Sequence, residues 1–316
     1  MRNAALIFLL STAACVSPTH RVFYINSYHI GYTPSDQVEA AITQNLDSKD
    51  IKLKKFHLDA KRLTEMELKL RATKAWKSVK RFKPEIVLIS DDNVIQNVVL
   101  PYYQDFDIPV LFCGINWSAE RYNLPRDRVT GMLEILPVEH CISLIRTSGY
   151  AITSITVLSE KSLGEEKNKA ELVPLFESLG LHVRYVMVEN FENWKSEFKK
   201  SQMDSSAIFL PTNGAISGWN RDEAMNFVSK ESIIPSFTCD DFMIDYCAFG
   251  LVKIAKEQGE WISEQAYKVL GGEPVKNIPI TQNRLFACIL NDELCHATGL
   301  KIKSTEFTCK NQTDVN

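Results

Sequence analysis

The chain has 316 residues, of which 45% are hydrophobic and 24% charged, and its formal net charge is −3 at pH 7. This composition is typical of a globular protein and excludes a disordered chain and a fibrous repeat. The weak negative charge, with Lys and Arg scattered along the chain, also argues against a nucleic-acid partner. Because the length exceeds that of one compact core, we expect two α/β lobes.

The beginning of the chain has the pattern of an export signal, with a positive charge, the apolar run Ala4–Leu10, small residues and then Cys15. The apolar run is shorter than the ~20 residues that a membrane-spanning helix needs. Ala14 followed by Cys15 resembles a bacterial lipoprotein signal, in which the cysteine is lipidated, although Thr12 replaces the usual aliphatic residue. A simple secretory peptide and a signal anchor are the alternatives. In each case residues 1–20 are signal and linker, and the protein works outside the cytoplasm.

A short apolar run, Val22 to Ile25, ends abruptly in the small, polar and aromatic segment Asn26–Tyr32. Such a run predicts a strand that is buried on both faces. Thr33 and Pro34, followed by apolar residues at helical spacing, predict the start of a helix. Ligands of open α/β sheets bind just beyond the carboxyl ends of the strands, so this loop is the first candidate for a binding site.

Strands and helices alternate along the rest of the chain. In a first series we predict strands at 52–58, 85–90, 108–113 and 129–134, with helices at 64–82 and after Asp91. A second series has strands at 154–159, 183–188, 207–211 and 233–238, with helices at 137–148, 165–179 and 194–200. Helices at 241–258 and 261–270, a strand at 285–290 and a helix at 292–298 follow, before a polar tail that we expect to be frayed. This alternation predicts parallel sheets with right-handed crossovers.

Polar residues stand at the ends of most predicted strands. Each of them alone could be a helix cap or a turn, because caps and turns use Ser, Asp, Asn and Gly. Capping does not require rings, however, and Tyr28, His29, Tyr32 and Trp117 therefore favour a binding surface. Two sheet edges of this kind, facing each other, would make a cleft for a small molecule.

Enzyme and cofactor motifs are absent. The chain has no G-x-G-x-x-G after the first strand, no phosphate-binding loop, no H-E-x-x-H and no G-x-S-x-G. The pairs Asp91-Asp92 and Asp240-Asp241 are typical of helix caps, and no nucleophile is evident for His29 to activate. We therefore expect no catalysis and no cofactor.

The eight cysteines are widely spread and show no C-x-x-C spacing. We interpret most of them as small buried hydrophobic residues and expect no metal site. A single disulfide is left open, and Cys309, which lies in the polar tail, is expected to pair with little of the core.

In the order and spacing of these segments, the chain resembles the bacterial ABC-transporter substrate-binding proteins of the type I periplasmic-binding fold. The resemblance lies in Asn26–His29 with Gly31 and Tyr32, in Asp91–Asn93, Pro109–Asn116 and Val129–Gly131, and in the closing segments Ile289–Asn291 and Thr298–Leu300. It covers nearly all of the chain from Val22 to Lys303.

The resemblance implies an α/β fold of two Rossmann-like lobes with parallel sheets, joined by a hinge of three crossings near residues 131–134, 235–238 and 278–283. Lobe 1 would contain residues 21–132 plus 238–278, lobe 2 residues 133–237 plus 279–303, and residues 304–316 a polar tail.

The resemblance also implies a solute-binding protein that captures a small polar or aromatic ligand, an amino acid among the candidates, by lobe closure and presents it to an ABC permease. The ligand-binding residues would be Ser27, Tyr28, His29, Tyr32, Asp92 and Asn116 in the first lobe, Ser159 and Asn213 in the second, and Asp240 near the hinge. The protein would lie in the periplasm or on the outer face of a bacterial membrane, with a lipid anchor at Cys15 as one means of attachment. A ligand sensor for a separate signalling membrane protein is the main alternative. An α/β enzyme that uses His29 or Asp240 as acid or base is a further one.

Overall fold

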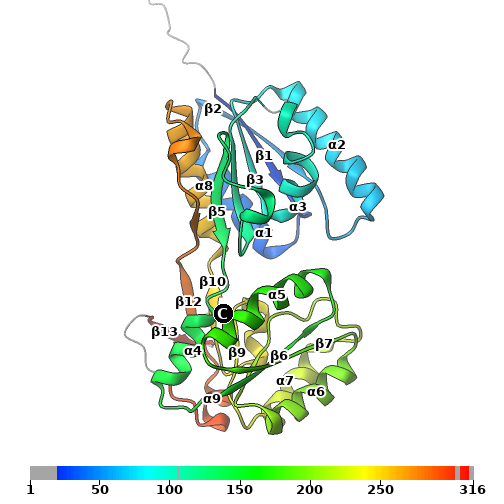
Figure 1. Ribbon diagram of the computed structural model, residues 1–316, viewed down its shortest axis with the longest axis vertical. Coiled ribbons are helices and arrows are strands. Elements are labelled where there is room, and N and C mark those ends of the chain that lie inside the picture. Colours follow the sequence, from blue (N-terminus) through cyan, green and yellow to red (C-terminus); the bar gives the residue numbers. More distant parts are fainter. Residues whose placement is uncertain (1–19, 106, 303–306, 313–316) are drawn as a thin grey trace, which may run out of the picture. The chain divides into compact units, whose positions relative to one another are not determined.

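The computed structural model describes residues 20–105, 107–302 and 307–312. It is an α/β protein with two sheets of mainly parallel strands, as predicted, and helices cover the sheets (Figure 1). The predicted signal segment with Cys15 lies outside the described residues, as does much of the predicted tail. None of the helices in the described ranges combines the length and hydropathy needed to cross a membrane.

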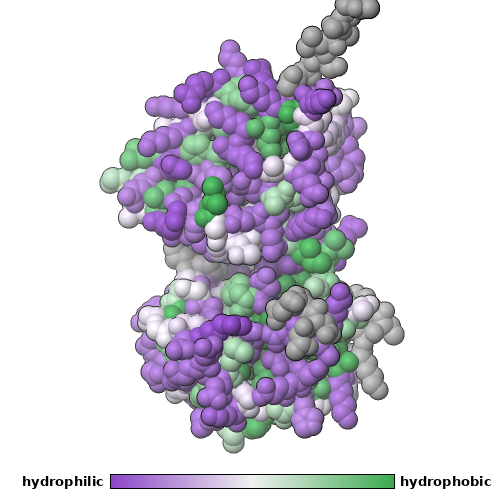
Figure 2. All heavy atoms as spheres, turned by 180° about the vertical axis from the view of Figure 1, so that it is seen from behind, coloured by the Kyte–Doolittle hydropathy of each residue, from purple (hydrophilic) through white to green (hydrophobic). Residues whose placement is uncertain are grey.

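The chain divides into two compact units. Unit 1 contains the described residues up to Phe112, together with Tyr122–Gly131 and Gly259–Pro279. Unit 2 contains Cys113–Arg121, Met132–Gln258 and the described residues from Ile280 onward. On the face that Figure 2 shows, each unit presents mostly hydrophilic side chains, with hydrophobic ones in scattered groups.

Unit 1 is built on most of a six-stranded sheet with the order β11-β5-β4-β3-β1-β2. Its strands are β1 (His20–Asn26), β2 (Ile51–His57), β3 (Ile86–Ser90), β4 (Val110–Asn116), β5 (Val129–Glu134) and β11 (Thr281–Gln282). The ends of β4 and β5 and all of β11 are assigned to unit 2. β1 pairs in parallel with β2 and with β3, so the carboxyl ends of these strands share one edge of the sheet.

The helices of unit 1 are α1 (Thr33–Asn45), α2 (Glu65–Phe82), the single turn α3 (Asp91–Val94) that continues as a π-helix (Ile95–Val99), and most of α8 (Ala255–Leu270), with short 3-10 turns at Tyr103–Asp105 and Val275–Asn277. A capping box starts α2, because Thr64 accepts from the Glu67 amide and the Glu67 side chain accepts from Thr64. Every residue of β3 is buried. The predictions of β1 to β5 and of the helix at 64–82 are therefore confirmed to within a few residues, whereas no strand was predicted at β11.

Unit 2 is built on a seven-stranded sheet with the order β13-β12-β10-β9-β8-β6-β7. Its strands are β6 (Ser154–Glu160), β7 (His182–Val188), β8 (Ala207–Phe209), β9 (Ser236–Thr238), β10 (Phe249–Lys253), β12 (Phe286–Leu290) and β13 (Cys309–Asn311). Its helices are α4 (Val138–Thr147), α5 (Leu163–Ser178), α6 (Phe191–Asp204), α7 (Arg221–Glu231) and α9 (Asp292–Thr298). Of these, α7, β10 and β13 have no counterpart in the sequence-based prediction, whereas α9 agrees with it.

The segment 241–258 differs from its prediction as one helix. It consists of a 3-10 helix (Asp241–Tyr246), then β10, and only then the start of α8. A short buried apolar run looks the same in a strand and in a helix, so periodicity could not separate the two. β10 pairs with β9 on one side and with β12 on the other.

This pairing also moves a boundary between the units. Residues 238–258 were expected in the first lobe, whereas the structure assigns them to unit 2 and passes to unit 1 at Gly259. The divisions after Gly131 and after Pro279 fall inside the predicted ranges 131–134 and 278–283. The chain also crosses from unit 1 to unit 2 after Phe112 and returns to unit 1 after Arg121, and these two crossings were not expected.

A disulfide joins Cys288 in β12 to Cys309 in β13. The prediction that Cys309 pairs with little of the core is therefore wrong. β13 runs parallel to β12 in a register that puts these two residues opposite each other, and a polar tail carries no such signal. Cys113, Cys141 and Cys239 are buried, in line with their interpretation as small hydrophobic residues.

Replacing Cys309 by serine is expected to lower the free energy of unfolding by about 2 kcal/mol, because the disulfide closes a loop with a sequence separation of 21 and so restricts the unfolded chain. Urea unfolding with and without a reducing agent measures the effect. The reductant should destabilise the wild-type protein and leave the Cys309→Ser variant unchanged. Equal midpoints for the wild-type protein in both conditions would contradict the expectation.

Candidate functional site

The loop after β1 is fixed by hydrogen bonds to the neighbouring strand end. Asn26 is fully buried, and its Oδ1 accepts from the Tyr28 amide at 2.9 Å and from Ser35 Oγ at 2.5 Å. Ser27 is also fully buried, and its hydroxyl donates to the Ser90 carbonyl at 2.7 Å. Ser27 therefore joins the ends of β1 and β3 and positions the rings that follow it.

Tyr28 and Tyr32 form an aromatic pair at this edge. Their ring centroids are 4.8 Å apart in an edge-to-face arrangement. The Tyr28 hydroxyl donates to Asp91 Oδ2 at 2.5 Å. Burial, and then the Asp91 carboxylate, raise the pKa of Tyr28 well above its usual value, so the phenol stays protonated and remains a donor.

Charged groups from the end of β2 lie beside these rings. His29 Nδ1 lies 3.4 Å from Asp59 Oδ1, and Arg62 holds the same carboxylate with bonds of 2.7 and 2.8 Å. The hydrogen bond from Arg62 lowers the pKa of Asp59. The Lys61 ammonium lies 3.8 Å from the ring centroid of Tyr32 and 4.9 Å from that of Tyr28.

Asp92 is buried close to the same edge, where its Oδ1 accepts from the Tyr122 hydroxyl at 2.6 Å. The structure thus brings Ser27, Tyr28, His29, Tyr32 and Asp92 together in unit 1. Asn116, which was expected with them, ends β4 in the part of the chain that is assigned to unit 2.

In unit 2, Trp117 follows Asn116 with a backbone φ of 64°, a conformation that is uncommon for a residue with a side chain. Its amide donates to the Glu134 carbonyl at 3.0 Å, and its indole nitrogen donates to Asn168 Oδ1 at 3.0 Å. Asn168 in turn donates to Glu165 Oε1 at 2.7 Å. The Trp117 ring is therefore held at a fixed place.

Glu165 is the centre of this network and is only 2% exposed. Its Oε2 accepts from Ser159 Oγ at 2.6 Å and from the Tyr185 hydroxyl at 2.9 Å. Burial raises the pKa of Glu165, although the hydrogen bonds oppose that change. Sequence reasoning missed this residue, because an acidic residue in the first turn of a helix is typical of capping.

The predicted residues Ser159 and Asn213 belong to this edge of the second sheet. The Ser159 hydroxyl lies 3.4 Å from that of Thr212, which precedes Asn213 in the turn after β8. The Asn213 carbonyl accepts from the Ile216 amide at 3.1 Å and shapes that turn.

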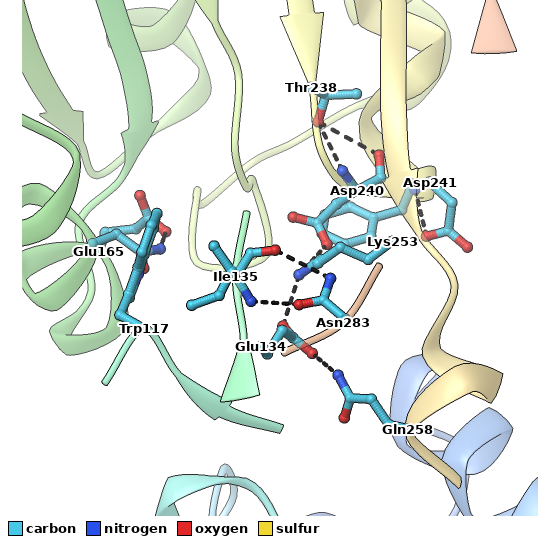
Figure 3. A network of polar contacts seen from close by, with 12 residues as sticks. Trp117, Glu134, Ile135, Glu165, Thr238, Asp240, Asp241, Lys253, Gln258 and Asn283 are labelled. Atoms are coloured by element: carbon cyan, nitrogen blue, oxygen red, sulfur yellow. Dashed lines mark hydrogen bonds and ion pairs between the residues drawn. The ribbon is translucent and has the colours of Figure 1, made fainter. Parts of the chain in front are cut away.

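A second polar network in unit 2 joins the ends of β5 and β10 (Figure 3). The Lys253 ammonium lies 2.8 Å from Glu134 Oε1 and 3.1 Å from Asp240 Oδ1, and Gln258 donates to Glu134 Oε2 at 2.7 Å. These side chains are largely buried, with exposed fractions of 17% for Lys253, 24% for Glu134 and 19% for Asp240.

The two carboxylates respond differently to their shared cation. Burial raises the pKa of Asp240, and the nearby Lys253 compensates only in part. For Glu134, the attraction of Lys253 and the hydrogen bonds outweigh burial and lower the pKa. Lys253 has a raised pKa because the two carboxylates outweigh its own burial. With all three groups ionised, this set carries one net negative charge.

No group of three or more His, Cys, Asp and Glu side chains in the described ranges is placed to hold a metal ion. A surface pocket of about 350 Å³ lies at the opposite edge of the unit 1 sheet, near His20, Ile51 and Tyr267, where β1 and β2 begin. The carboxyl ends of the strands differ from this pocket, because rings and charged groups gather there.

An α/β protein of two units, with rings and hydrogen-bonding groups at the carboxyl ends of parallel strands, has the features of a ligand-binding protein of the type I periplasmic fold. Residues 103–312 match the family model described as ABC transporter substrate binding protein. This match spans more than half of the chain, and the chain belongs to that family. The family is generally extracytoplasmic and typically non-enzymatic. No curated protein matches the sequence.

Solved structures agree with the type I fold. The chain is similar to CD0873, a substrate-binding protein with adhesive properties from Clostridium difficile in its ligand-free, open state, with a TM-score of 0.71 and 14% identity over 92% of this chain and 99% of that one. It is also similar to an ABC domain from Streptococcus pneumonia in complex with L-Trp, with a TM-score of 0.64 and 16% identity over 91% of this chain and 97% of that one. A third similar structure is a 5-methylthioribose transporter solute-binding protein from Thermotoga lettingae. Its TM-score to this chain is 0.55, with 10% identity over 92% of this chain and 96% of that one. The predicted family and fold class are thus confirmed.

Proposed function

We propose that the protein is exported, captures a small polar or aromatic solute by closure of its two lobes, and presents it to an ABC permease. An amino acid is one candidate ligand. The observation that supports this most directly is the pair of rings at Tyr28 and Tyr32, which lies beside Asp91 at the strand ends of unit 1. Two stable states of a hinged protein allow the binding energy to favour the closed form, which a permease can then recognise.

In this proposal the predicted residues have distinct roles. Tyr28 and Tyr32 stack on the ligand or enclose it, and His29 contributes a polar contact. Asn116 and Asn213 fix polar groups of the ligand, and Asp92 or Asp240 meets an amine. Ser27 acts through Tyr28, because its own hydroxyl is bonded to the Ser90 carbonyl. Ser159 likewise acts through Glu165, because its buried hydroxyl is bonded to that carboxylate. We also propose that Cys15 carries a lipid that holds the protein at the membrane.

Replacing Tyr28 by alanine is expected to abolish ligand-induced stabilisation while the ligand-free protein still folds. The substitution removes a half-buried ring from a loop and leaves the buried strands on either side intact. A thermal-shift screen of amino acids, nucleosides and sugars on the mature protein measures the response. An unchanged shift in the variant would remove the loop from the site.

Tyr267→Ala is the matched control for this experiment. Tyr267 also belongs to unit 1, is 45% exposed and donates to the Asn45 carbonyl at 3.0 Å. It lies at the opposite edge of the sheet, so its loss should leave the ligand response unchanged. Stabilisation of the wild-type protein by no compound of the screen would count against solute capture itself.

A further inference from the structure

The ammonium group of Lys61 lies on the faces of two tyrosine rings. It is 3.8 Å from the centroid of Tyr32 and 4.9 Å from that of Tyr28, and the Lys61 side chain is exposed. Within residues 20–105, 107–302 and 307–312, no carboxylate forms an ion pair with Lys61. The rings are thus the groups that hold this cation.

The backbone places Lys61 there. β1 and β2 run side by side in parallel, and the pairing continues past their ends, because the Leu58 amide donates to the Asn26 carbonyl at 2.8 Å and the Ala60 amide donates to the Ser27 carbonyl at 2.9 Å. The chain that carries Lys61 therefore follows the loop that carries both rings, although the two segments are far apart in sequence.

The rings are well suited to bind a positive charge. The face of a tyrosine ring is negative, and cations within about 6 Å of its centroid are attracted to it. The hydrogen bond that the Tyr28 hydroxyl donates to Asp91 at 2.5 Å shifts electron density into that ring and strengthens the attraction. Asp91 and its neighbour Asp92 add a negative field at the same strand end.

We propose that Tyr28 and Tyr32 recognise an ammonium or quaternary ammonium group of the ligand, and that Lys61 occupies this surface in the ligand-free protein and is displaced by the ligand. This inference rests on the proposed function and names the chemical class of the solute. Lys61 then acts as an internal competitor. Its long, exposed side chain regains conformational freedom when the ligand displaces it, and this favours the exchange.

The opposite role for Lys61 would be a direct contact to an anionic group of the ligand. The two roles differ in the sign of the Lys61→Ala effect. If Lys61 competes, its removal should tighten the binding of an amine by about 2- to 5-fold, which corresponds to one exposed cation–π contact. If Lys61 contacts an anion, the same change should weaken binding.

The experiment compares pairs of probes that differ in the positive charge, namely choline with 3,3-dimethyl-1-butanol, and phenylalanine with 3-phenylpropanoate. Thermal shift, followed by calorimetry, is measured for the wild-type protein and for Lys61→Ala. We expect at least one amine to bind while its partner probe does not, and we expect tighter binding of that amine to Lys61→Ala. Equal binding within both pairs, binding of neither amine, or weaker binding to Lys61→Ala would overturn the proposal.

Two further variants test the surface itself. Tyr32→Phe keeps the ring and should bind the amine as the wild-type protein does, whereas Tyr32→Leu should lose at least as much affinity as Lys61→Ala gains. Lys54→Ala is the matched lysine control, because Lys54 lies 5.5 Å from the ring centroid of Phe82 and outside the strand ends, and it should change nothing. Equal affinities for Tyr32→Leu and Tyr32→Phe would contradict the role of the ring.

The outcomes also separate this inference from the proposed function. The same assay includes sugars and nucleosides, which carry no ammonium group. If a sugar or nucleoside stabilises the protein and no amine does, solute capture stands and recognition of a cation is wrong. If no compound of any class stabilises it, both proposals fail.

Discussion

Replacing Lys253 by methionine is expected to lower the free energy of unfolding by about 3 kcal/mol, because it leaves two largely buried carboxylates without their shared cation. Methionine has a similar length and introduces no new charge. Removing one partner of a buried ion pair usually costs more than the pair contributes, since the remaining charge has lost its solvation. Urea unfolding at neutral pH measures the loss.

The two carboxylates are expected to affect stability differently when each is neutralised. Glu134→Gln removes a group with a lowered pKa and should destabilise the protein by about 1 kcal/mol at neutral pH. Asp240→Asn removes a group with a raised pKa and should leave stability unchanged or raise it. Equal losses in the two variants would contradict the view that Lys253 compensates Glu134 more fully than Asp240.

The pH dependence follows from the same shifts. The lowered pKa of Glu134 contributes stability above the group's unfolded value near 4.5, and that stability is lost as the pH falls through the folded pKa. The raised pKa of Asp240 has the reverse effect, so its contribution is fully present below its unfolded value near 3.8 and is lost as the pH rises through the folded pKa. Below about pH 5, the free energy of unfolding should therefore fall less steeply in Glu134→Gln than in the wild-type protein. Urea unfolding curves at a series of pH values measure this difference.

Replacing Gly131 by alanine is expected to destabilise unit 1 by about 3 kcal/mol, because the new methyl group has no space. A Cβ atom at this position would lie 2.2 Å from the Phe112 carbonyl oxygen and 2.4 Å from the Phe112 ring. Phe112 is fully buried in β4 and cannot turn away without disturbing the sheet. Chemical unfolding of the variant measures the effect.

Gly164→Ala is the control for that substitution. Gly164 lies in the first turn of α5, where an added Cβ would meet only Ser162 Oγ at 3.8 Å. Alanine favours a helix more than glycine does, so this variant should be as stable as the wild-type protein or more stable by about 0.5–1 kcal/mol. Similar losses in both variants would show that the close approach of Phe112 is not the cause.

Much of the fold could be predicted because local patterns and the fold agree. The strand at 85–90 is a buried apolar run, and the helix at 64–82 begins with a capping box. Both elements are found as expected. β10 was missed because a buried segment of five residues has no distinctive period. β13 was missed because three residues of a polar tail become a strand only when they pair with β12.

The candidate site was predictable to a smaller extent. Tyr28 and Asp92 stand out in the sequence because each comes shortly after the end of a predicted strand. The structure places both at one edge of the sheet. Glu165 carried no such signal, since its burial depends on Ser159 and on Tyr185 from another strand. Lys61 likewise carried no signal in the sequence, because only the pairing of β1 with β2 places its side chain on the two rings.

The sequence by itself determined the α/β class, most of the strands and helices and the family resemblance, because hydrophobic periodicity, caps and motif order are local properties of the chain. Only the tertiary structure decided that residues 238–258 belong to unit 2, that Cys288 meets Cys309, and which charged groups share Lys253. Burial, disulfide pairing and the compensation of charge all depend on neighbours that are distant in the sequence, and the fold alone brings those neighbours together.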